Sequence, residues 1–136
     1  MTNPTGTVPY EVRKGTTRHV LAVGDIAIKL AINDRGINCN RREAETWRAV
    51  SEKNKHVLCP VLWISPCGTA LTLKRVQMLT EEEFSAQLNA NAVPEWDTHC
   101  GDGDDPTECK ASNWGWLDGR MLAVDYALPS FHDCEN

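Results

Sequence analysis

Two β-rich runs near the start of the chain, Thr17–Val23 and Ile26–Ala31, are joined by Gly24-Asp25, a pair typical of two-residue hairpin turns. The second run alternates strictly, so its apolar side chains share one face and its only charged side chain lies on the other. The first set is Ile26, Ile28 and Leu30, and the second is Ala27, Lys29 and Ala31. Small neighbours would leave a recessed surface beside the Lys29 amine, where a planar ligand could lie. The alternative is a solvent-facing lysine.

A helix is predicted over residues 40–50, with Asn38 or Asn40 as its cap. Its apolar stripe consists of Ala44, Trp47 and Val50.

Glu43 borders this stripe and can lean toward the preceding sheet to meet Lys29. Such a contact would hold the amine extended toward phosphate oxygens. The alternatives are an ordinary partner for a base one helical turn away, or Glu45 in the same role.

A second hairpin is predicted from residues 57–65 and 69–76, across Pro66-Cys67-Gly68. Thr80-Glu81-Glu82-Glu83 then has the form of a capping box, which opens a short helix through about Ala90. The order is β-β-α-β-β-α-loop-β-β. It predicts an α+β fold of antiparallel hairpins with one or two helices rather than alternating βαβ units.

A third hairpin is expected from Trp114–Leu117 and Arg120–Val124, with a turn at Asp118-Gly119 whose two residues both have positive φ. Asn113 and Asp125 would be neighbours at its open end. A carboxylate beside a carboxamide offers hard oxygen ligands for Mg²⁺ that also holds phosphate. The alternative is an ordinary hairpin.

The length of 136 residues indicates one domain. We expect a flexible N-terminal arm over residues 1–16, a single domain over 17–128 and a C-terminal tail over 129–136. Within the domain, residues 91–112 are expected to be an acidic loop insertion, because prolines and glycines interrupt the stretch and it does not follow the EF-hand pattern.

The net charge of −5 and the absence of a basic stripe argue against binding of nucleic acid. No apolar run approaches the length needed to cross a bilayer, so no membrane contact is expected and the predicted location is the cytoplasm. The six cysteines form no Cys-x-x-Cys pair, which does not favour zinc. A site would have to combine distant side chains among His99, Cys100, Cys109, His132 and Cys134.

Taken together, the lysine strand, the helix glutamate and the last hairpin resemble the protein-kinase-like fold, including its small-molecule phosphotransferase branch. Residues 23–29 look like the family's Val-Ala-x-Lys strand, which implies that Val23, Ala27 and Lys29 contact nucleotide and that Glu43 pairs with Lys29. Lys74–Met78 falls where the family has the hinge that meets adenine. The cofactors implied by the resemblance are ATP and Mg²⁺.

The second half of the resemblance concerns catalysis. Asp97-Thr98-His99 is similar to the opening of the catalytic loop, which implies that Asp97 is the catalytic base acting with Lys29. Asn113 and Asp125 correspond to the two metal-binding positions, the latter in an Asp-Tyr-Ala version of Asp-Phe-Gly. The chain also resembles very small phage-encoded kinase-like proteins, in which Asn-Trp-Gly, Asp-Gly-Arg and Val-Asp-Tyr recur.

Two departures from the family shape the functional expectation. Only one glycine, Gly15, stands where the family has three, and eleven residues follow Asp125 where a full kinase has most of its helical lobe. We therefore expect a truncated, catalytically impaired kinase-like protein that binds a protein partner, a host factor in takeover or counter-defence if the chain is phage-encoded. The alternative is a minimal Mg²⁺-ATP-dependent phosphotransferase, and a lower one is a zinc-stabilised interaction domain.

Overall fold

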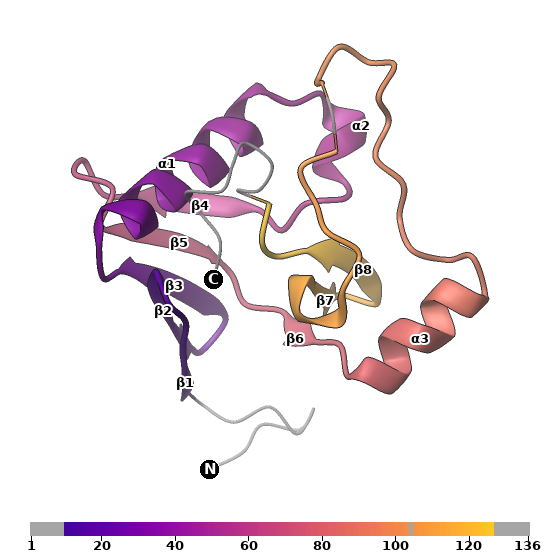
Figure 1. Cartoon of the computed structure of the whole chain (residues 1–136), viewed down its shortest axis with the longest axis horizontal. Coiled ribbons are helices and arrows are strands. Elements are labelled where there is room, and N and C mark those ends of the chain that lie inside the picture. The colour runs from indigo at the N-terminus through magenta and orange to yellow at the C-terminus, as the bar shows by residue number, and fades with distance from the viewer. Residues whose placement is uncertain (1–9, 104, 127–136) are drawn as a thin grey trace.

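The computed structural model describes residues 10–103 and 105–126. They form an α+β fold with two antiparallel sheets, which confirms the predicted class. The first sheet has five strands in the order β1-β2-β3-β5-β4 and the second has three in the order β6-β7-β8 (Figure 1). The strands are β1 Tyr10–Lys14, β2 Arg18–Val23, β3 Ile26–Ala31, β4 Val61–Ile64, β5 Ala70–Lys74, β6 Gln77–Met78, β7 Trp114–Leu117 and β8 Arg120–Ala123.

The helices are α1 Asp34–Ala49, α2 Glu52–Lys55, α3 Glu81–Asn89 and a 3-10 turn at Ala111–Asn113. Helix α1 packs on one face of the five-stranded sheet, and we call the other face the outer face. No helix in the described part of the chain has the length and apolar character required to cross a membrane.

Both predicted two-residue turns are present. Gly24 has φ +58° and Val23 pairs with Ile26, while Asp118 and Gly119 have φ +53° and +78° and Leu117 pairs with Arg120. These turns could be predicted because Gly and Asp adopt positive φ values at low cost, and the need for positive φ depends only on the turn residues themselves. The capping box is present too: the Thr80 hydroxyl accepts from the Glu83 N–H at 3.0 Å, and the Glu83 carboxylate accepts from the Thr80 N–H at 2.9 Å.

Helix α1 begins earlier than predicted. Its cap is Asn33, whose side chain accepts from the Gly36 N–H at 3.0 Å, so neither Asn38 nor Asn40 is the cap. The early turns carry no apolar stripe, and their stability comes from close packing instead. A Cβ on Gly36 would lie 2.2 Å from the Thr17 carbonyl oxygen, so the helix start approaches the sheet as only glycine allows.

The arm expected over residues 1–16 needs correction, because Tyr10–Lys14 form β1. Alternating side chains let this segment pair with β2 in regular antiparallel register, from Tyr10 opposite Val23 to Lys14 opposite His19. Residues 1–9 and the tail at 129–136 lie outside the described residues. The acidic loop over 91–112 has no helix or strand in its described part except the start of the 3-10 turn.

The core has two parts. The larger part surrounds the second sheet, where Trp114 and Tyr126 are almost fully buried together with Leu58. Leu58 lies in the strand predicted over residues 57–65, but the observed strand β4 begins at Val61. Leu58 forms an isolated β-bridge to Ala123 instead. The smaller part lies between α1 and the sheet and contains Ala44, Cys59, Leu71 and Leu73. The charged groups described next lie between these two parts.

Candidate functional site

Glu43 is the centre of a buried group of charged side chains. It projects from α1 and is fully buried. Its carboxylate accepts hydrogen bonds from both terminal nitrogens of Arg18, at 3.0 and 3.2 Å, and from the Lys29 amine at 2.7 Å. One carboxylate therefore joins β2, β3 and α1.

The strand register explains why two basic side chains reach this helix. Val20 on β2 stands opposite Lys29 on β3, so Arg18 and Lys29 share the sheet face that α1 covers. Lys29 is buried rather than facing solvent, because its small neighbours Ala27 and Ala31 let the helix approach. The sequence left open whether Lys29 faces solvent, and the structure places it on the face that α1 covers.

Asn40, one turn before Glu43, completes the polar contacts. Its Oδ1 accepts from Arg18 at 3.1 Å, and its amide donates to the carbonyl oxygens of Lys29 at 3.2 Å and Gly68 at 2.9 Å. The residue is fully buried, and these bonds satisfy its polar atoms. Asn40 therefore fixes the position of the arginine relative to β3.

The segment after β8 reaches the same place from the far end of the chain. The carbonyl oxygen of Val124 accepts from the Lys29 amine, and the backbone N–H of Tyr126 donates to Glu43 at 3.2 Å. The Asp125 carboxylate lies 3.4 Å from the Arg18 guanidinium. Arg18, Lys29, Glu43 and Asp125, which we call the charge cluster, thus bring together two cations and two carboxylates.

This balance sets the pKa values of the two acids in opposite directions. Burial alone would raise the pKa of Glu43, but Arg18 and then Lys29 offset this effect and hold it well below its ordinary value. Burial, and then the charge of Glu43, raises the pKa of Asp125 above its ordinary value. Glu43 is therefore the permanent anion, and Asp125 is the acid that takes up a proton more readily.

A pocket adjoins the charge cluster on the same side of the sheet. Its cavity volume is about 40 Å³, it opens to solvent, and Lys29 forms part of its wall. Its apolar surface comes from β2, β3, β5, β6 and the segments beside them: Val20, Ala22, Ala27, Leu73, Val76, Met78 and Val124. Its charged lining is mostly basic, with Arg13, Lys29, Lys74 and Arg75 against Glu11. In a chain of net charge −5, this is a local excess of positive charge.

The segment Lys74–Met78, predicted to be a hinge, lines this pocket through all but one of its residues, Gln77. The prediction that Val23 contacts a nucleotide needs correction. Val23 is 43 % exposed and lies on the outer face, because side chains along a strand alternate and Ala22 takes the inward position. Val20 and Ala22 are the β2 residues that line the pocket.

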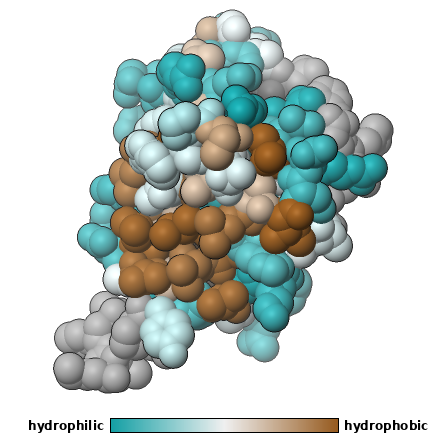
Figure 2. All heavy atoms as spheres, turned by 90° about the vertical axis from the view of Figure 1, so that its left-hand side faces the viewer, coloured by the Kyte–Doolittle hydropathy of each residue, from teal (hydrophilic) through white to brown (hydrophobic). Residues whose placement is uncertain are grey.

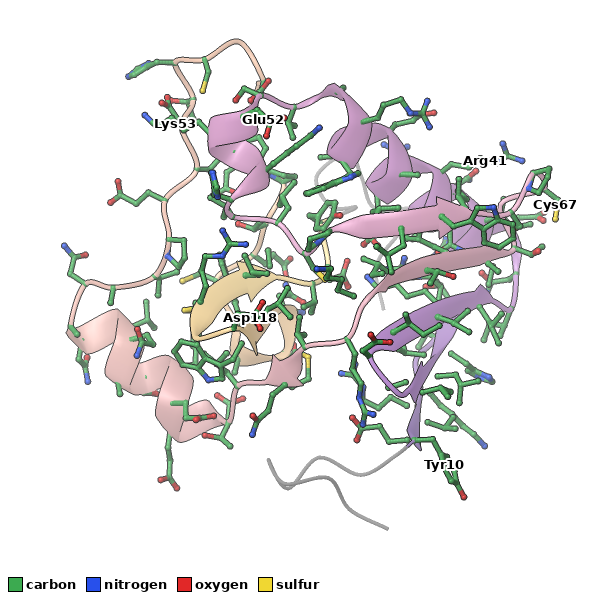
Figure 3. All side chains as sticks on the ribbon, turned by 180° about the vertical axis from the view of Figure 1, so that it is seen from behind. Tyr10, Arg41, Glu52, Lys53, Cys67 and Asp118 are labelled. Carbon is green, nitrogen blue, oxygen red and sulfur yellow. The ribbon has the colours of Figure 1, made fainter. Side chains whose placement is uncertain are left out.

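Asp97 lies outside the charge cluster. Its carboxylate pairs with Lys53 of α2 at 2.6 Å and accepts from the His99 N–H at 2.7 Å. These hydrogen bonds, first that from Lys53, lower the pKa of Asp97 to about 2. Figure 3 shows Lys53 projecting from α2 toward the loop that follows α3. No contact joins Asp97 to Lys29 within the described residues.

Asn113 lies beside the cluster, since its carbonyl oxygen accepts from the Val124 N–H at 2.8 Å. The pair Asn113 and Asp125 is therefore present at the open end of the hairpin. The Arg18 guanidinium contacts one Asp125 oxygen at 3.4 Å, so a Mg²⁺ bound there would share this carboxylate with Arg18. Among the described residues, no group of three or more His, Cys, Asp or Glu side chains could hold a metal ion.

The sequence prediction missed Arg18 and Asn40. Arg18 falls in the alternating pattern of β2, on the same face as Val20 and Ala22, and this spacing was the available signal. Asn40 was interpreted as a helix cap, because an Asn ahead of an apolar stripe is typical of one.

No protein-family model matches this chain, and no curated protein matches it. Among solved structures, the chain is similar to a choline/ethanolamine kinase family protein from Mesorhizobium loti, with a TM-score of 0.47 and 14 % sequence identity. The match covers 88 % of this chain and 58 % of that one, so this chain spans less than two thirds of its length. Likeness this weak supports no functional conclusion.

Proposed function

We propose that this protein is a kinase-like binding module that holds a nucleotide in the pocket beside Lys29 and is impaired in phosphoryl transfer. The observation that carries the proposal is the closed charge cluster next to an open, positively charged pocket. The pocket supports binding of an anion, whereas Arg18 contacts both carboxylates of the cluster and would compete with a metal for Asp125.

Two properties of the pocket favour a nucleotide. Its apolar walls, including Val20, Ala27 and Met78, suit a flat ring, and its basic residues suit phosphates. An ammonium group has three N–H donors. Lys29 gives two of them to Glu43 and the Val124 carbonyl, which leaves one donor for an anion.

The impairment rests on the acids. Arg18 contacts both Glu43 and Asp125, so a second cation joins the Lys29–Glu43 pair and the acid beside it. Asp97, which the kinase resemblance assigns as the base, pairs with Lys53 and has a low pKa, which makes it a weak proton acceptor. The protein partner, a host factor if the chain is phage-encoded, stays a prediction that capture from host lysate would test.

The alternative is a minimal phosphotransferase in which Lys29 orients the phosphates and Glu43 positions Lys29. The buried Lys29–Glu43 pair at 2.7 Å favours it. The two functions differ in two measurable respects, the Mg²⁺ dependence of ATP binding and the release of ADP. The binding module takes ATP equally well with and without Mg²⁺, whereas the enzyme needs Mg²⁺ and releases ADP.

The test is calorimetric titration of ATP into the protein, in EDTA and in Mg²⁺, alongside an ADP-release assay. We expect saturable binding that Mg²⁺ changes by less than threefold, and no ADP release. Ala27→Leu, which fills the pocket, should weaken binding at least tenfold, which is about 1.4 kcal/mol. Val23→Leu on the outer face is the matched control and should bind as wild type does.

Two results would overturn the proposal in different ways. Absence of ATP binding in both buffers would remove the nucleotide site. ADP release that requires Mg²⁺ and is lost in Asp125→Asn would establish the enzyme instead. A fourth variant, Arg18→Met, tests the cause of impairment: it should make ATP affinity depend on Mg²⁺, because the guanidinium no longer contacts Asp125.

A further inference from the structure

Strand β1 is an edge of the five-stranded sheet, and all five of its residues are exposed. Its backbone pairs with β2 on one side only. Within residues 10–103 and 105–126, no strand pairs with its other side. An exposed edge of this kind presents unpaired N–H and C=O groups to another chain.

The hairpin turn determines which backbone groups face outward. Val23 and Ile26 flank a two-residue turn, so their backbone groups bond to each other across β2 and β3. Along β2, residues that bond to β3 alternate with residues that bond to β1. The Gly15 N–H donates to the Arg18 carbonyl at 2.9 Å, and this hydrogen bond fits the same every-second-residue pattern. Glu11 and Arg13 therefore bond to β2, and Tyr10, Val12 and Lys14 present their N–H and C=O groups outward.

The sequence of β1 is complementary to itself in antiparallel orientation. If two copies of Tyr10-Glu11-Val12-Arg13-Lys14 pair about Val12, Val12 meets Val12, Glu11 meets Arg13 and Tyr10 meets Lys14. Opposite charges directly across strands stabilise pairing, and a lysine stem packs well along a tyrosine ring. Every outward backbone group of the three residues then has a partner.

The individual side chains are free to make these contacts. Arg13 has no ion pair or hydrogen bond to any described residue. Glu11 lies 3.5 Å from Arg75, a long contact that leaves its second oxygen for a further cation. Tyr10 and Val12 are 67 % and 55 % exposed, and Figure 3 shows Tyr10 at the outer limit of the sheet. In Figure 2, hydrophobic side chains gather on the side of the molecule that carries the sheet.

The opposite edge of the sheet lacks these features. Strand β4 has an irregular register between Val61 and Trp63, a break of the kind that protects edges, and its sequence Val-Leu-Trp-Ile has no charged residue. Self-recognition by charge is therefore available at β1 and absent at β4.

We propose that two copies of this chain associate through β1, in antiparallel register about Val12, to give one continuous sheet across the pair. A single short strand buries little surface, so the dimer is of the weak, reversible class and forms in a concentration-dependent way. The reciprocal Glu11–Arg13 pairs determine the register, and added salt weakens the association.

Sedimentation velocity over a hundredfold concentration range tests this with the full chain and no nucleotide. We expect a reversible monomer–dimer equilibrium for the wild type. Arg13→Glu and Glu11→Arg each place like charges opposite each other and should raise the dissociation constant at least tenfold. The exchanged double variant Glu11→Arg/Arg13→Glu restores both pairs and should dimerise as the wild type does.

Val12→Pro tests the backbone contribution. The outward N–H of Val12 takes no part in the β1–β2 ladder, so proline removes only the bond to the second copy. Its circular dichroism spectrum should match the wild type, with the dimer lost. A protein that is monomeric at every concentration would overturn the proposal. So would a dimer that is indifferent to both Val12→Pro and the single charge reversals.

Discussion

Replacing Glu43 by glutamine is the sharpest perturbation of this fold, because it removes one charge and almost no volume. The Glu43 carboxylate accepts bonds from two nitrogens of Arg18, from Lys29 and from the Tyr126 N–H, and its side chain is fully buried. Removing the anion leaves the buried cluster with an excess positive charge. Such a change costs about 3–5 kcal/mol.

That cost is a large part of a total stability of roughly 5–15 kcal/mol. At an m-value of about 2 kcal/mol per molar, Glu43→Gln should lower the urea midpoint by about 2 M at pH 7. Glu45→Gln is the matched control, since Glu45 is exposed on the same helix. It should change the free energy of unfolding by no more than about 0.5 kcal/mol.

The pH dependence has a definite sign. Folding lowers the pKa of Glu43 from an ordinary value of 4.5, so its stabilising contribution is complete above that value and is lost as the pH falls below it. The difference between wild type and Glu43→Gln should therefore be constant above about pH 6 and should narrow below pH 4.5. A cost under 1 kcal/mol at pH 7, or a difference that does not narrow in acid, would refute the assignment of Glu43 as a paired anion.

Three further outcomes are expected. Gly115→Ala would bring a Cβ to 2.3 Å from Val76, so it should destabilise the protein by about 1–3 kcal/mol in urea titration, and an unchanged midpoint would contradict this close approach. Thr80→Ala removes the capping box and should lower the free energy of unfolding by about 1 kcal/mol in the same titration. The helical signal from α3 should also decrease. Hydrogen bonds, first that with the Thr69 hydroxyl, lower the pKa of Cys67 to about 7, so iodoacetamide should alkylate it half-maximally near that pH. In Thr69→Val the midpoint of alkylation should rise, and an identical profile would exclude this cause.

The parts of the fold that the sequence predicted are those fixed by neighbouring residues. The turns at Gly24-Asp25 and Asp118-Gly119, and the capping box at Thr80, each depend on a few consecutive side chains and their own backbone. The alternation of β3 put Lys29 on the same face as Ala27 and Ala31 but left open whether that face meets solvent. Neighbouring residues were therefore enough to predict the strand and the turns.

The parts that the sequence did not predict depend on contacts between distant segments. The first turns of α1 have little apolar pattern and exist because Gly36 fits against Thr17. Strand β1 was interpreted as an arm because its sequence has no periodic apolar pattern, and its residues stay exposed even though β2 pairs with them. The resemblance implied that Val23 contacts nucleotide, whereas its neighbour Ala22 lines the pocket, and the pairing of β2 with β3 shows which of the two faces inward.

The site was predicted in part. The contact of Lys29 with Glu43 and the position of Asp125 beside it are present, while their roles toward a nucleotide stay predictions. Arg18 was missed because a basic residue at the start of a strand usually faces solvent. Its burial follows from Asn40 and Glu43 on a helix whose start the sequence misplaced.

The wide spacing of the contacts around Glu43 also governs how the chain acquires its structure. The contacts of Tyr126 with Glu43, of Val124 with Lys29 and of Asp125 with Arg18 span 83, 95 and 107 residues. Loops of this length slow folding, because their closure entropy is lost before the contacts form. Without Asp125, the group of Arg18, Lys29 and Glu43 has one unbalanced positive charge, which the segment after β8 neutralises. We therefore expect the contacts of this segment to form late in folding.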